Sequence, residues 1–263
     1  ILSMTGTMYF PALLPSFQVE WGLTNTAAGW VNGVFFAGYA IASPVLVSFT
    51  DRVPAHRIYL PSALLAALAM LLFGWLAEGT WTASALRLLA GIGLAGTYMP
   101  GLKALSDNLS GPGQSRHIVY YTASYGVGTA LSVYLAGLLE PVTGWRVGAE
   151  LLALGPLCAL LIFAAVVPPG KPAGSGPGLH VSRNDLRIVL GNRPVVGYIL
   201  GYGSHNWELF GYRSWLVAFL AYSLSLHPGF TPSMSPQNVA MLILLAGVPA
   251  SILGNEGAMA WGR

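Results

Sequence analysis

The sequence predicts an all-α, polytopic membrane protein in which a bundle of helices crosses the bilayer. Two observations lead to this prediction: 54% of the 263 residues are hydrophobic and only 8% are charged, and the apolar residues fall into long runs without alternation. A soluble domain carries about 25% charged residues, so this chain lacks the polar surface that water requires. Apolar runs of about 20 residues are long enough to cross a bilayer as helices, whereas barrel strands would be shorter and alternating.

Eight apolar runs are candidate spans, and we number them in chain order. They cover residues 1–17, 27–49, 58–77, 83–105, 118–139, 147–167, 195–225 and 239–259. The first run is short for a span, and we interpret it as a truncated helix. The seventh is long, and we expect one of its ends to lie at the membrane interface.

Basic residues mark alternate connections between these spans. Arg52 and Arg57 follow span 2, Lys103 and Arg116 flank the connection after span 4, and a further basic stretch follows span 6. Because cytoplasmic loops carry an excess of Lys and Arg, this alternation predicts a multi-pass protein of the inner (plasma) membrane. The prediction places three loops in the cytoplasm, at residues 50–57, 103–117 and 168–194. It also accounts for the net charge of +3, so no nucleic-acid partner is expected.

A polar stretch after the sixth span predicts a boundary between domains. It contains Pro-Pro-Gly-Lys-Pro-Ala-Gly-Ser-Gly-Pro-Gly, a composition typical of flexible linkers. A short amphipathic helix is expected near its end, at residues 185–190. We therefore expect a six-helix N-terminal half at residues 1–167, a cytoplasmic linker at 168–193, and part of a second half at 194–263.

Several motifs follow one another in a familiar order. Residues 47–57 read Val-Ser-Phe-Thr-Asp-Arg-Val-Pro-Ala-His-Arg, and residues 87–100 begin Arg-Leu-Leu-Ala-Gly-Ile-Gly and end in proline. With six spans, a long linker and further spans, these motifs resemble the major facilitator superfamily. Residues 254–256, Gly-Asn-Glu, are similar to a second copy of the first motif, as expected of two repeated halves. The resemblance implies a twelve-span transporter of which this chain covers about spans 1–8.

The resemblance also implies a function. Members of this family are secondary active transporters that move a small solute by alternating access, driven by a proton, ion or solute gradient. The family's loop after span 2 braces the two halves at the inner face, which implies a gating role for Asp51, Arg52 and Arg57, with an ordinary solvated loop as the alternative. The arginine at position 87 is implicated in substrate binding or proton coupling. The expected partners are the solute, the lipid bilayer and the missing C-terminal spans of the same protein.

Span 7 carries the densest cluster of polar side chains, with His205, Trp207, Glu208 and Arg213 within nine residues. Ionisable groups inside a bilayer are expensive and mark solute or proton pathways. His205 and Glu208 are three positions apart and share a helix face. We predict substrate contact or proton coupling for this cluster, with an interhelical polar clamp, or partners in the missing spans, as the structural alternatives.

The remaining candidate residues each have a structural alternative. Asn32, Tyr121 and Tyr125 could line a central cavity, although aromatic side chains in spans more often pack or anchor at the interface. Arg87 could instead extend to the interface or pair with Glu150. Two arginines within spans would suit an anionic substrate. Import of a small anion and efflux of an amphipathic drug both remain open.

A different class of protein, a membrane receptor or a membrane-embedded enzyme, is disfavoured by the sequence. An enzyme would need a convergent catalytic set, and none is indicated. The chain contains one cysteine, Cys158, and no phosphate-binding or zinc-helix motif. We therefore expect no enzymatic activity, no cofactor and no metal site.

Overall fold

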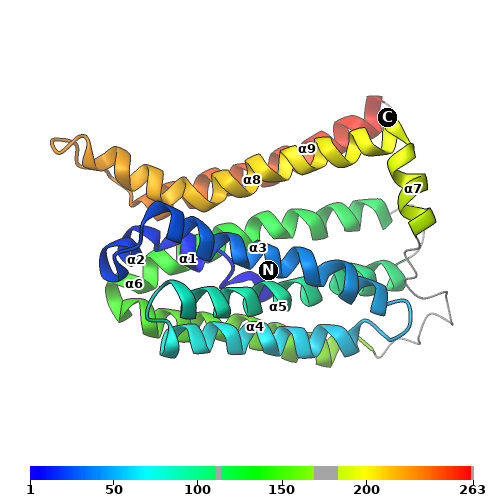
Figure 1. Ribbon diagram of the computed structural model, residues 1–263, viewed down its shortest axis with the longest axis horizontal. Helices are drawn as coiled ribbons and strands as arrows, with labels where there is room; N and C mark the ends of the chain where they lie inside the picture. The colour runs from blue at the N-terminus through cyan, green and yellow to red at the C-terminus, as the bar shows by residue number, and fades with distance from the viewer. Residues whose placement is uncertain (110–113, 169–182, 262–263) are drawn as a thin grey trace.

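The computed structural model describes residues 1–109, 114–168 and 183–261, and these residues contain helices but no strands (Figure 1). The helices are η1 (Leu2–Met4), α1 (Tyr9–Ala12), α2 (Leu14–Trp21), α3 (Asn25–Phe49), α4 (His56–Leu76), α5 (Thr80–Asn108), α6 (Gln114–Val166), α7 (Arg183–Gly191), α8 (Arg193–Ser225) and α9 (Pro236–Trp261). The prediction of an all-α bundle is confirmed. Most of the predicted linker, residues 169–182, lies outside the described residues, and α7 contains the short helix expected at its end.

Within the described part of the chain, five helices are long and apolar enough to cross a membrane, namely α3, α4, α5, α6 and α9. Helix α6 is 53 residues long and contains a non-helical position at Gly144, where φ is 76° and ψ is 162°. This positive φ favours glycine and turns the chain back on itself, so α6 holds the predicted fifth and sixth spans. The protein is therefore a multi-pass membrane protein, as predicted.

The two remaining predicted spans differ from the others. The first is divided into η1, α1 and α2, and Leu13, with φ −108° and ψ 15°, separates the last two. Prolines at positions 11 and 15 favour this interruption, because proline cannot donate a backbone hydrogen bond. This segment nevertheless lies at the centre of the hydrophobic core, where Phe10 and Phe17 are fully buried. The seventh predicted span forms one helix, α8, which is too polar to count among the five apolar helices.

Close backbone contacts hold α5 between α3 and α4. A Cβ atom at Gly91 would collide with the carbonyl oxygen of Phe35 on α3, and one at Gly96 would collide with the hydroxyl of Ser62 on α4. Small residues at such positions let membrane helices approach closely, which is the packing that glycines spaced along a span indicate. On α8 the Gly-x3-Gly spacing of Gly197 and Gly201 indicates the same kind of packing, but an added Cβ at either position meets no described atom within 4 Å.

The long helices lie side by side, so that the bundle has two ends (Figure 1). The α3–α4 turn, α7 and the last turn of α9 lie at one end, which we call the basic end because Arg52, Arg57, Lys103 and Arg116 belong to it. The α4–α5 turn, the bend in α6 and the α8–α9 connection lie at the opposite end. Helices α8 and α9 run along one side of the other helices, where α9 packs on α6 and α8 contacts α1 and α2.

Candidate functional site

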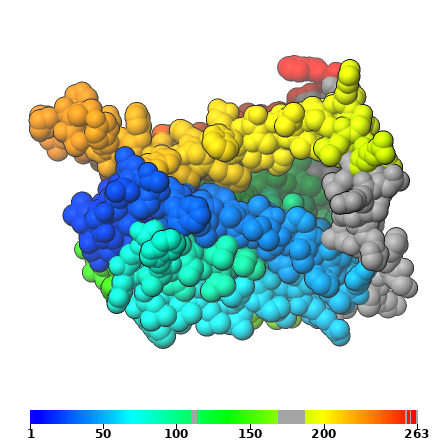
Figure 2. Space-filling view, viewed as in Figure 1, coloured from blue at the N-terminus to red at the C-terminus, as the bar shows by residue number. Residues whose placement is uncertain are grey.

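A cavity of about 790 Å³ lies between α8 and α9 on one side and α3, α5 and α6 on the other. Figure 2 shows the surface hollowed between α3 and α8, with α6 at the back of the hollow. Seven aromatic residues line the cavity: Phe35, Phe36, Tyr39, Tyr98, Tyr125, Tyr202 and Phe210. Polar lining comes chiefly from Ser43, Thr122, His205, Asn206, Arg213 and Ser251. This size and this mixture of apolar walls and few polar groups are typical of small-molecule sites.

The cavity is closed towards the opposite end, because α3 and α8 meet there. The rings of Phe36 and Phe210 have centroids 4.5 Å apart, and Gly29 approaches Trp215. Nearer the basic end the two helices no longer meet, and the side chains of Tyr39 on α3 and Tyr202 on α8 line the cavity between them. The site is thus a pocket whose floor is the α3–α8 contact.

Arg213 provides the positive charge of this pocket. Among the described residues that line the cavity, it is the one with a permanent charge, and no carboxylate accompanies it. Its guanidinium lies 5.5 Å from the centre of the Tyr125 ring, and its Nε is buried without a hydrogen-bond partner in the described part of the chain. A guanidinium has five donors, so Arg213 keeps capacity for a ligand.

Arg87 lies behind the wall of the pocket rather than in it. The side chain is 3% exposed, and its guanidinium is 4.1 Å from the centre of the Phe35 ring, which itself lines the cavity. It donates hydrogen bonds to the Thr7 carbonyl at 3.1 Å, the Gly6 carbonyl at 3.5 Å and the Asn32 side-chain oxygen at 3.3 Å. The segment holding Gly6 and Thr7 is a turn outside the helices, where carbonyl oxygens keep capacity for a side-chain donor, although the Gly6 carbonyl also accepts from the Tyr9 backbone NH at 3.3 Å.

Neither structural alternative predicted for Arg87 is observed. The side chain does not extend to an interface, because it is enclosed by the segment between η1 and α1, by α3 and by its own helix. Glu150, the predicted partner, instead accepts a hydrogen bond of 2.9 Å from the indole nitrogen of Trp75. The guanidinium is held by carbonyl oxygens and an aromatic face, both of which stabilise a buried cation.

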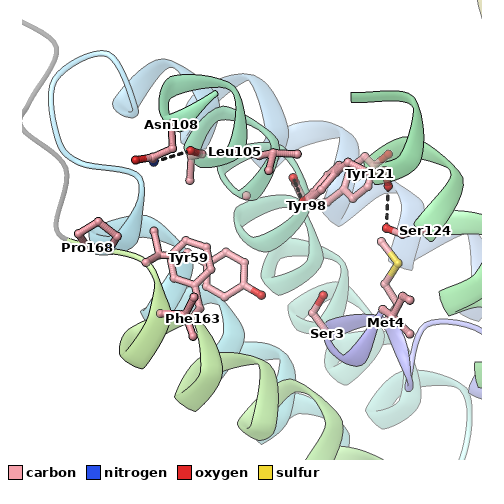
Figure 3. A pocket seen from close by; sticks show the side chains of 15 residues that line it. Ser3, Met4, Tyr59, Tyr98, Leu105, Asn108, Tyr121, Ser124, Phe163 and Pro168 are labelled. Carbon is pink, nitrogen blue, oxygen red and sulfur yellow. Dashed lines mark hydrogen bonds between the residues drawn. The ribbon is translucent and has the colours of Figure 1, made fainter. Parts of the chain in front are cut away.

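The predicted lining residues Asn32, Tyr121 and Tyr125 occupy three different places. Tyr125 lines the cavity. Asn32 lies below its floor and donates a hydrogen bond to the Ser214 hydroxyl. Tyr121 donates to the Tyr98 carbonyl at 2.7 Å and lines a second, separate pocket of about 420 Å³ among α4, α5, α6 and η1. Figure 3 shows the rings of Tyr121 and Tyr98 side by side at one edge of that second pocket.

The polar cluster of α8 is divided between two surroundings. His205 lines the cavity beside Asn206. Trp207 is 86% exposed, and Glu208 is exposed as well; neither lines the cavity within the described structure. His205 is therefore the member of the predicted pair that a solute in the cavity would meet.

The predicted gating residues Asp51, Arg52 and Arg57 are exposed in and beside the α3–α4 turn at the basic end. No ion pair joins them to other described residues. The ion pair that does cross between the two groups of helices connects Arg116 on α6 with Glu256 on α9, at 3.2 Å. Glu256 belongs to the predicted second copy of the loop motif.

Sequence reasoning missed most of the aromatic wall. Phe35, Tyr39 and Ser43 recur every four residues on α3, so they form one face of that helix. This spacing was available in the sequence. It could not show that this face borders a cavity, because a spanning helix is apolar on every side and its inner and outer faces look alike.

Comparison with known proteins places the chain in a family. The probable sphingolipid transporter spinster homolog 2 of Arabidopsis thaliana is 24% identical over 215 residues, which are 75% of this chain and 44% of that protein. The gentisate transporter of Corynebacterium glutamicum is 28% identical over 158 residues, 59% of this chain and 35% of the relative. The cis,cis-muconate transport protein of Acinetobacter baylyi is 25% identical over 263 residues, with 95% and 63% covered.

In each of these relatives the matched region is less than two thirds of the whole protein, so the chain spans only part of their length. The family described as the Major Facilitator Superfamily matches residues 1–263, the entire chain. The helical bundle, the apolar spans and this match lead to one conclusion: the chain belongs to the Major Facilitator Superfamily of membrane transporters.

Proposed function

We propose that this chain belongs to a secondary active transporter that moves a small organic anion by alternating access. The observation that carries the proposal is Arg213, a cation that lines the central cavity with a buried Nε and no partner for that atom among the described residues. A charge in a low-dielectric site attracts the opposite charge strongly, and a guanidinium binds a carboxylate with paired hydrogen bonds.

The charges around the cavity support an anion over a cation. Arg87 stands behind Phe35 and adds a second positive charge close to the wall. No carboxylate lines the cavity within the described residues, so neither arginine is neutralised there. The field inside the cavity is therefore positive, which raises the local concentration of anions.

The aromatic wall supports an organic solute that contains a ring or a conjugated chain. Flat π-systems pack well against aromatic side chains in offset or edge-to-face arrangements. Two of the relatives are named for carboxylic acids of this kind, gentisate and cis,cis-muconate. A cavity of about 790 Å³ is large enough for such a molecule.

The pattern of basic residues indicates which side of the membrane the cavity faces. With the basic end in the cytoplasm of an inner-membrane protein, the cavity faces the cytoplasm and the α3–α8 contact closes the outer side. Outward opening would then require α3 and α8 to separate, while the α3–α4 turn with Asp51, Arg52 and Arg57 would close against the second half. We propose that a proton gradient drives the cycle and that His205, with Glu208 one turn away, carries the coupling proton.

Uptake into proteoliposomes tests this proposal. The protein is expressed from its complete reading frame, and labelled gentisate and cis,cis-muconate are supplied with an imposed pH gradient. A lost charge-assisted hydrogen bond is worth about 1.5–3 kcal/mol, so Arg213→Gln is expected to raise KM roughly 10- to 100-fold. Arg213→Lys keeps the charge without the paired geometry and serves as the matched control, with a smaller rise.

Uptake of the anions by wild type with an unchanged KM in Arg213→Gln would contradict the role of Arg213.

The remaining candidate is export of an amphipathic compound, which the apolar wall and the sphingolipid-transporter relative favour. Transport of sphingosine by liposomes that move neither acid would establish that alternative. For coupling, His205→Gln is expected to abolish the stimulation of uptake by the pH gradient.

A further inference from the structure

A directed chain of hydrogen bonds crosses from α5 to α8 just below the floor of the cavity. Arg87 on α5 donates to the side-chain oxygen of Asn32 on α3, at 3.3 Å. The amide nitrogen of Asn32 donates to the hydroxyl of Ser214 on α8, and that hydroxyl donates to the Phe210 carbonyl at 2.5 Å. Arg87, Asn32 and Ser214 are all buried.

The chemistry of the three side chains determines which group donates and which accepts in each of these hydrogen bonds. A guanidinium only donates, so the oxygen of Asn32 must face Arg87, and the amide NH₂ is left for Ser214. Ser214 uses its one proton on the Phe210 carbonyl and therefore accepts from Asn32. An aspartate or an alanine at position 32 would break the sequence of donors and acceptors at that point.

We infer that Asn32 and Ser214 form the latch that holds the outer side of the cavity closed, and that Asn32 thereby positions Arg213. The inference rests on the proposed alternating-access cycle. Ser214 is the immediate neighbour of Arg213, so a bond that fixes the rotation of α8 at Ser214 also fixes the direction in which Arg213 enters the cavity. Asn32 acts through these neighbours and is a positioning residue.

The contrast between two pairs of helices supports this assignment. Helices α6 and α9 stay together over their length: Gly137 meets Gln237 near the opposite end, and Arg116 meets Glu256 at the basic end. Helices α3 and α8 meet at the floor, and the cavity lies between them beyond it. Outward opening must therefore separate α8 from α3 as well as from α1 and α2, and the Asn32–Ser214 hydrogen bond is the polar connection of the α3–α8 contact.

The latch can be tested without any solute. In a background without native cysteines, which within this chain requires Cys158→Ala, Leu209→Cys places a thiol in the cavity wall. Intact cells expressing the complete reading frame are treated from outside with a membrane-impermeant maleimide. We expect Asn32→Ala and Ser214→Ala each to raise the labelling rate at least threefold, because the outer side opens more often. Ser214→Thr keeps the hydroxyl and should return the rate to that of the parent.

Gly33→Ala is the matched control, since it changes the neighbouring position on α3, where an added Cβ meets nothing within 4 Å. Parental labelling rates in both Asn32→Ala and Ser214→Ala, or an equal increase in Gly33→Ala, would overturn the latch. A positioning role further requires that Asn32→Ala raise KM for the transported acid more than it lowers the maximal rate. If the wild type moves no acid while the labelling pattern holds, the proposed substrate fails and the latch stands.

Discussion

Two arginines in this protein lie on either side of one aromatic wall, and their surroundings differ. Arg87 is enclosed by helices packed backbone to backbone, and its guanidinium is used by two carbonyls, an amide and an aromatic ring. Arg213 is half-buried at the edge of a cavity, where its guanidinium lies near the Tyr125 ring, and its Nε, like that of Arg87, has no hydrogen-bond partner among the described residues. The same side chain is part of the scaffold in one region and available to a solute in the other.

A buried charge in a membrane protein is therefore not by itself a binding group. What separates the two arginines is the number of acceptors that the protein supplies, together with access to a cavity. Arg87 still contributes charge to the cavity from behind Phe35, whereas Arg213 supplies both charge and free donors. Substitution of Arg87 should therefore change mainly the stability of the protein, whereas substitution of Arg213 should change mainly the binding of the solute.

The largest expected effect is on stability, at Arg87. Arg87→Ala would leave the Thr7 carbonyl and Asn32 without their donor and would open a void, for a loss on the order of 3 kcal/mol in the free energy of unfolding. Arg213→Ala should change the same quantity by less, about 1 kcal/mol, because the half-buried guanidinium at the edge of the cavity loses only its interaction with Tyr125. Thermal unfolding in detergent measures both, and equal losses would contradict the comparison.

The next effect tests the tight packing around Arg87. Gly91→Ala places a methyl group against the Phe35 carbonyl and should destabilise the protein by about 1–3 kcal/mol. Gly33→Ala, with open space around it, should stay within about 0.5 kcal/mol of wild type. If both variants unfold at the wild-type temperature, α3 and α5 are not as close as the structure shows.

A smaller effect is expected at Tyr125, beside Arg213. Tyr125→Ala removes the ring near the guanidinium and should raise KM for the acid about two- to tenfold, in keeping with cation–π energies of roughly 0.5–1 kcal/mol or slightly more. Tyr125→Phe keeps the ring and should stay close to wild type. Uptake kinetics decide the matter, and a larger loss in the phenylalanine variant would show that the hydroxyl, not the ring, matters.

The smallest effect belongs to the Arg116–Glu256 ion pair. Both side chains are largely exposed, and such pairs contribute little and are screened by salt. We expect Arg116→Ala to leave the unfolding temperature unchanged within error at physiological ionic strength. A clear destabilisation that disappears at high salt would mean that this pair helps hold α6 against α9.

Much of the fold could be predicted from the sequence, because membrane spans are encoded by length and hydrophobicity alone. The positions of α3, α4, α5 and α9, the bend in α6 and the close packing at Gly91 all follow from such local signals. The division of the first span was not predicted, although its two prolines were visible.

The site was predicted only in part. Arg213, His205 and Tyr125 were identified because polar groups in an apolar span stand out. Tyr39, Tyr98 and Tyr202 were missed, since nothing local marks the face of a spanning helix that borders a cavity. The partners of Arg87 are backbone carbonyls of another segment, and a sequence does not display which carbonyls are free.

The most direct test of the account is whether Arg213 recognises a negative charge. Isothermal titration of the purified protein with gentisate, and with the neutral amide of the same acid, measures that recognition as a ratio of affinities. We expect that wild type prefers the acid by at least tenfold, that Arg213→Lys keeps part of this preference, and that Arg213→Gln loses it while still binding the amide. Equal preference for the acid in wild type and Arg213→Gln would contradict the claim that this arginine is the anion-binding group.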